Sequence, residues 1–165
     1  FGLSQGLMPI FGYNYGARNI DRLYSVLKRG LVIAVCIMLT GTVLMWTIPD
    51  VLLSLFGNES SFTDVDQATL MREGEHAFRI ISLCFVPAAA GITFTTLFQA
   101  VGKGFRSLLL SFCRQLILLL PSALLLTTLF GVHSAWYAFP IAEAGALLLA
   151  LLFFGDLVKN DFSKR

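Results

Sequence analysis

Two charged residues, Arg114 and Glu143, lie well inside long apolar stretches of the sequence. If those stretches cross a membrane, an ionised side chain there costs about 2.5 kcal/mol or more unless it is paired or hydrated. With a rise of about 1.5 Å per residue, Arg114 would lie roughly 10 Å from the inner end of its helix and Glu143 roughly 12 Å from the outer end of its own. In a hydrocarbon core about 30 Å thick, their backbones then differ in depth by less than about 10 Å. We therefore expect that the two residues can pair directly or through water, either lining a solute or proton path or fixing two helices to each other.

Four amide side chains are further polar groups at or near membrane depth: Gln5, Asn14, Gln99 and Gln115. Each can both donate and accept hydrogen bonds. Hydrogen bonding between helices is the commoner role for any one of them in a membrane protein.

Signatures of enzymes and of metal sites are missing from the sequence. It contains no His-Glu-x-x-His, no Gly-x-Ser-x-Gly and no glycine-rich phosphate loop, and no second acid lies at membrane depth beside Glu143. Cys36, Cys84 and Cys113 lie in apolar stretches at unrelated spacings, which favours packing over disulfides or zinc. We expect no enzymatic activity, no cofactor and no metal, and the charge pattern offers no patch for nucleic acid.

Four apolar stretches, at 30–49, 80–101, 108–130 and 135–154, are each long enough to cross a bilayer as a helix of roughly 20 residues. Only 13% of the residues are charged, about half of the roughly 25% that is usual in soluble domains. We predict an all-α, polytopic transmembrane helical bundle that forms a single unit over residues 1–165. It has about four full spans plus the end of a fifth, at 1–17 (partial), 30–56, 77–101, 107–130 and 135–157.

The charges between these stretches predict an orientation. Four of the five charges at 18–29 are basic, whereas 57–76 holds five acidic residues and one arginine, Arg72. By the positive-inside rule, loop 18–29 and the C-terminus are cytoplasmic and loop 57–76 is external, in a multi-pass protein of the cell membrane.

Each span also contains a residue that disturbs helices: Pro9, Gly41, Pro87, Pro121 and Pro140. A proline removes a backbone hydrogen bond and tends to kink a helix, so several together favour bent helices that can move. The short connectors at 102–106 and 131–134 predict that neighbouring helices form antiparallel hairpins.

The stretch at 2–19, Gly-Leu-Ser-Gln-Gly-Leu-Met-Pro-Ile-Phe-Gly-Tyr-Asn-Tyr-Gly-Ala-Arg-Asn, with Asp21 and Arg22 after it, resembles the eighth transmembrane segment and following loop of multidrug and toxic compound extrusion (MATE) transporters. Three later pieces are similar to the same family: 98–104, Arg114-Gln115 with Pro121, and 136–143.

The resemblance implies twelve spans in two six-helix lobes, of which this chain would be the end of the second, with an N-terminal lobe missing. It also implies a secondary antiporter that expels organic cations or other amphipathic drugs in exchange for H⁺ or Na⁺. By that similarity, Gln5, Pro9 and Asn14 belong to a helix on the cavity side, while Arg114, Gln115 and Glu143 match a polar set of the last two helices. Some members bind the coupling cation through acids of the second lobe, yet 80–101 contains no acid here, which points to residues outside this chain.

Two alternatives remain open. A related flippase for a lipid-linked precursor would share the bundle, but its cavity should be more cationic than one arginine makes it. A scaffold or assembly subunit that transports nothing would also be polytopic, and kinked helices with buried charges argue only mildly against it.

Overall fold

The computed structural model describes residues 2–54 and 64–162, and nearly all of them are helical. The helices follow one another as α1 (Gly2–Gly16), α2 (Ile20–Thr47), α3 (Pro49–Ser54), α4 (Asp64–Ser82), α5 (Phe85–Ala100), α6 (Gly104–Phe112), the π-helix η1 (Cys113–Leu119), α7 (Leu120–Phe130), the 3₁₀-helix η2 (Val132–Tyr137), α8 (Ala138–Leu157) and the π-helix η3 (Val158–Phe162). The described ranges contain no strand, which confirms the predicted fold class.

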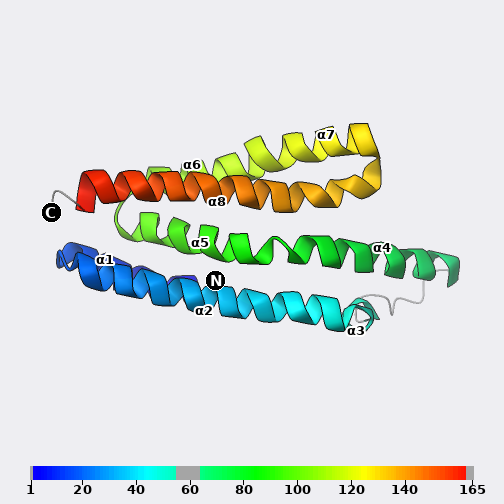
Figure 1. Ribbon diagram of the computed structural model, residues 1–165, viewed down its shortest axis with the longest axis horizontal. Helices are drawn as coiled ribbons and strands as arrows, with labels where there is room; N and C mark the ends of the chain where they lie inside the picture. Colours follow the sequence, from blue (N-terminus) through cyan, green and yellow to red (C-terminus); the bar gives the residue numbers. More distant parts are fainter. Residues whose placement is uncertain (1, 55–63, 163–165) are drawn as a thin grey trace.

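Long rods side by side make up the molecule (Figure 1). Three of them are long and apolar enough to cross a membrane, namely Ile20–Thr47, Gly104–Phe130 and Val132–Asn160. A fourth span results if Arg72–Ser82 and Phe85–Ala100, which meet at an angle of 49°, are counted together. Helix α5 is central, because it packs against α1, α2, α6 and α8.

The prediction of a connector at 18–29 is wrong for most of its length, because α2 begins at Ile20. Asn19 caps this helix, its side chain accepting a hydrogen bond from the Arg22 backbone N–H at 3.1 Å. Hydropathy reports where the bilayer begins and says little about where a helix begins. At about 1.5 Å per residue, a helix of 28 residues is longer than the roughly 30 Å hydrocarbon core, so its first turns can be charged.

The predicted loop 57–76 is also corrected, because residues 64–76 belong to α4, while 57–63 lie outside the described residues. The many acidic residues of this segment favour a loop when the sequence is considered alone. A polar sequence still forms a helix where one face packs, and Ala77 and Ile80 of α4 are buried. The predicted span 30–56 is likewise interrupted, since α2 ends at Thr47 and Pro49 opens α3, as expected for a residue pair that ends in proline.

The bend between α4 and α5 falls at Leu83 and Cys84, and Pro87 lies in the first turn of α5. Side chains of α2 bond to the polar groups near the bend. Trp46 Nε1 donates to Ser82 Oγ at 2.7 Å, and Thr42 Oγ1 donates to the Ser82 carbonyl at 3.2 Å. A broken helix is tolerated at membrane depth when its neighbours satisfy it in this way.

Candidate functional site

The rod Gly104–Phe130, made of α6, η1 and α7, changes from an α-helix to a π-helix where the site lies. Between α6 and α7 the chain forms the π-helix Cys113–Leu119, and Pro121 follows two residues later. Pro121 has no backbone N–H, so the carbonyl of Ile117 loses its ordinary partner one turn on. Wider turns of this kind occur frequently at functional sites, and Arg114 is the second residue of this one.

Arg114 and Glu143 meet across the hairpin, with Arg114 Nη1 3.4 Å from Glu143 Oε1. The sequence-based hypothesis that they can pair is therefore confirmed. Their side chains are 32% and 17% exposed. A charge-assisted hydrogen bond is normally about 2.7–2.9 Å long, so this pair is loose. Glu143 Oε2 is buried and has no hydrogen-bond partner among the described residues.

Small residues of α8 allow the close approach that brings Glu143 to η1. Ala138, Ala142, Ala146 and Ala150 recur every four residues and are all buried. Gly145 lies directly against η1, since a Cβ there would lie 2.9 Å from Leu118 Cδ1. A face of small side chains lets two helix backbones approach each other in a membrane protein.

A cleft of about 240 Å³ opens beside the pair, between α1, α5 and the α6–η1 rod. Its lining combines hydroxyl, amide and guanidinium groups with a few apolar side chains: Ser4, Gln5, Met8, Ile92, Thr95, Thr96, Gln99, Ser111 and Arg114. A second space of about 10 Å³ is lined by Thr95, Ser111, Arg114 and Glu143, among others. That space is about the minimum that holds one water molecule. Arg114 lines both, so it connects Glu143 to the cleft.

The structure brings some of the predicted polar residues together and separates others. Gln5, Gln99 and Arg114 line the 240 Å³ cleft, and Gln99 Nε2 also donates to Ser107 Oγ at 2.9 Å. Pro9 and Asn14 line a different, wider depression of about 880 Å³ between α1 and the first turns of α2. The Asn14 amide is buried and donates to the Ile10 carbonyl at 2.8 Å. Gln115 is exposed and lines neither space.

The hydroxyl groups that line the cleft are not among the polar residues predicted from the sequence. Thr95, Thr96 and Ser111 stand within apolar stretches and carry no charge, and Thr95 fits a face of small residues with Gly91, which favours packing over a place in a cleft. A signal was nevertheless present, because Ser107, Ser111 and Arg114 are spaced four and three residues apart, which places them on one helical face.

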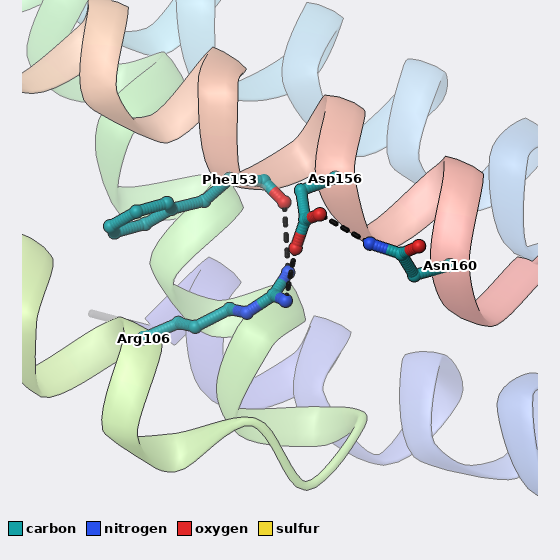
Figure 2. A network of polar contacts seen from close by, with 4 residues as sticks. All are labelled: Arg106, Phe153, Asp156 and Asn160. Carbon is teal, nitrogen blue, oxygen red and sulfur yellow. Dashed lines mark hydrogen bonds and ion pairs between the residues drawn. The ribbon is translucent and has the colours of Figure 1, made fainter.

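A second arginine joins the same hairpin at its other end (Figure 2). Arg106, in the first turn of α6, donates to the Phe153 carbonyl of α8 at 3.1 Å and pairs with Asp156. Asp156 also accepts a hydrogen bond from Asn160 of η3. Arg106 therefore ties the start of α6 to the end of α8.

Comparison with known proteins gives a consistent result. Residues 1–125 match the family model MatE. The multidrug export protein MepA of Staphylococcus saprophyticus subsp. saprophyticus is 25% identical over 151 residues, which cover 92% of this chain and 31% of that protein. This chain therefore spans about a third of the length of the curated relatives it matches.

Solved structures match over nearly the whole chain. The MATE multidrug transporter DinF-BH, solved in complex with R6G, is 30% identical with a TM-score of 0.79 over 96% of this chain and 33% of its own. An inward-facing MATE transporter of the MOP superfamily gives a TM-score of 0.84 over 98% of this chain and 37% of its own, and at 22% identity that likeness speaks for the fold alone. The family match, over most of the chain, and the shared fold lead to one conclusion: this chain is a multi-pass membrane protein that belongs to the MATE family.

Proposed function

We propose that this chain is the end of the second lobe of a secondary antiporter that exports drugs or organic cations in exchange for H⁺ or Na⁺. An N-terminal lobe of the same protein would complete the central cavity, and the lipid bilayer would surround both. In the cell membrane, the turn between α1 and α2 and the C-terminus would be cytoplasmic, with residues 57–76 outside.

The observation that carries this proposal is the 240 Å³ cleft between α1, α5 and the α6–η1 rod. Ligand pockets are mostly apolar with a few polar groups that orient the ligand, and here hydroxyl and amide groups stand beside Met8 and Ile92. Such a lining suits an amphipathic solute, whose apolar part contacts the side chains while its polar part meets the hydroxyls. Gln5, Gln99 and Arg114 are the predicted path residues that this cleft supports.

Glu143 would act on the path through Arg114, because it does not line the cleft. Pro9 and Asn14 are proposed to lie on the cavity side by family resemblance, with a role in the shape of α1. For Gln115 we propose a contact with lipid or with the other lobe, since its side chain is exposed.

Export is tested with the full-length parent protein in cells that lack their own efflux pumps. Cells that express it should accumulate several-fold less ethidium, a fluorescent organic cation, than cells with an empty vector. A Thr95→Val change removes one cleft hydroxyl and should slow export several-fold. Thr128→Val is the matched control, because Thr95 and Thr128 each donate to the carbonyl four residues earlier and Thr128 lies on α7, away from the cleft. Unchanged ethidium accumulation in the expressing cells would contradict the proposal.

A further inference from the structure

We propose that Glu143 is the proton-binding site of this lobe and that Arg114 transmits its protonation state to the cleft. This inference rests on the proposed function, and it names the coupling ion and the group that binds it. When Glu143 takes up a proton, Arg114 loses its counter-ion, and the positive charge that remains beside the cleft repels a cationic solute.

The geometry of the Arg114–Glu143 pair allows Glu143 to exchange its contact with Arg114 for a proton. One carboxylate oxygen lies 3.4 Å from Arg114 Nη1, and the other is buried with no partner in the described part of the chain. A buried acceptor without a partner destabilises the ionised form of the side chain. A proton on Oε2 removes the negative charge and turns that oxygen into a donor. The space of about 10 Å³ beside the pair is the size that a single water molecule needs to deliver the proton.

The surroundings of Glu143 hold few other charges that could replace Arg114. The Cys84 thiol at the bend before α5 interacts electrostatically with Glu143, and α5 and α7 contain no titratable side chain. On the remaining elements packed against α8, counting only the parts of α4 and η3 whose side chains are described, the titratable and charged groups besides Arg114 are these: Arg106 of α6, Cys113 of η1, His133 and Tyr137 of η2, Lys159 of η3, and Arg72, Glu73, Glu75, His76 and Arg79 of α4. Arg106 pairs with Asp156, His133 with Glu73 and Arg79 with Glu75. Arg114 is therefore the counter-ion of Glu143.

The same geometry favours a proton over a sodium ion at Glu143. A metal cation bound to the carboxylate would lie close to the Arg114 guanidinium, which is always charged. Residues 2–54 and 64–162 also offer no group of three or more His, Cys, Asp or Glu side chains that could hold a metal ion. A proton needs only one oxygen atom, and Glu143 Oε2 is available.

The exchange is balanced in charge. A hydronium ion gives its proton to Glu143 Oε2 and leaves as water, and the pair changes from a net charge of zero to a net positive charge. Binding of a monovalent organic cation in the cleft favours the reverse step, in which the carboxylate returns its proton to water and pairs again with Arg114. Because coupling between two binding sites is reciprocal, the proton must weaken cation binding by the same factor as the cation weakens proton binding.

Direct binding measurements on the purified full-length parent test this assignment. Ethidium affinity of the wild type should fall about tenfold from mildly alkaline to mildly acidic pH, a coupling of typical size. Ethidium binding in weak buffer should also release protons. Glu143→Gln mimics the protonated state, so it should bind ethidium weakly at every pH and release no proton. Glu75→Gln makes the same chemical change in an exposed i,i+4 pair with Arg79 and should behave as the wild type.

The outcomes distinguish a failure of the proposed function from a failure of the assignment of Glu143 alone. Wild-type protein that binds no ethidium at any pH overturns the proposed function and this inference with it. A Glu143→Gln protein that binds ethidium with the wild-type pH dependence and proton release overturns the inference alone. If Glu143→Gln does not fold, Glu143→Asp keeps a titratable group, and its pH profile should move along the pH axis; an unmoved profile excludes Glu143.

Discussion

The α6–η1–α7 rod and α8 are joined by two arginine–carboxylate pairs that use the same chemistry in different ways. At one end, Arg106 binds both the Phe153 carbonyl and Asp156, while Asp156 also accepts from Asn160 (Figure 2). Further along, Arg114 reaches one oxygen of Glu143 at 3.4 Å, and the other oxygen has no partner within the described ranges.

The more exposed carboxylate of the two has the more complete set of hydrogen bonds, which is the reverse of what stability alone would favour. Asp156 is 47% exposed, so water could satisfy it, yet it is bonded on both oxygens. Glu143 is 17% exposed, and protein groups do not satisfy it fully. A structural ion pair at membrane depth would be expected to have more hydrogen bonds than one at a helix end. We interpret the Arg106–Asp156 pair as a fastener, that is, a structural contact that holds the two helices of the hairpin together. We interpret the Arg114–Glu143 pair as a site at which the carboxylate exchanges its partner.

The largest effect is expected from breaking the deeper pair. In the full-length protein, Arg114→Leu leaves a carboxylate in an apolar site, and unfolding should become easier by about 2–3 kcal/mol, below the usual cost of a broken buried pair because Glu143 can take up a proton instead. Thermal unfolding in detergent measures this change. The double variant Arg114→Leu with Glu143→Gln removes both charges and should recover most of the loss. Equal unfolding temperatures for the single and double variants would mean that the two side chains do not interact.

A second large effect is expected at Pro121, which follows the π-helix. Alanine restores the missing N–H, so η1 can rewind as an α-helix and turn Arg114 away from Glu143. We expect Pro121→Ala to slow ethidium export about tenfold while stability is kept or raised, because proline is costly within a helix. Pro140→Ala is the control, since Pro140 lies in the first turn of α8, where proline is well tolerated. Equal export by both variants would show that the π-helix does not position Arg114.

The sequence predicts the features that depend on hydropathy and connector length, but not those that depend on where a helix ends or how it winds. The four long rods and the Arg114–Glu143 contact follow from hydropathy and from short hairpin connectors, which fix depth and neighbours. The start of α2 at Ile20 could not be read from hydropathy, since that helix extends beyond its apolar part. The side on which Gln115 lies depends on the winding of η1, because each π-turn shifts the facing by one residue.

The close approach of α8 to η1 can be tested by a substitution that leaves every charged residue unchanged. A methyl group at Gly145 would lie 2.9 Å from Leu118 Cδ1, so the leucine must move, and Gly145→Ala should destabilise the protein by about 1 kcal/mol. Gly155 on the same helix has no atom within 4 Å of such a methyl group. Gly155→Ala should therefore stabilise α8 by up to about 1 kcal/mol through helix propensity. Unfolding temperatures that shift in the same direction for both variants would contradict close packing at Gly145.

The smallest effect is expected at the fastener, where Asp156→Asn removes the charge and keeps an oxygen that can accept from Arg106. Because Asp156 is half exposed, solvent screens the pair, and the loss of stability should stay below about 1 kcal/mol. Proton release on ethidium binding should remain at the wild-type level, since Asp156 keeps its partners at the helix end while Glu143 alone is proposed to exchange them. If Asp156→Asn removed proton release as Glu143→Gln should, the two pairs would share one task, and the contrast between a fastener and an exchanging site would be wrong.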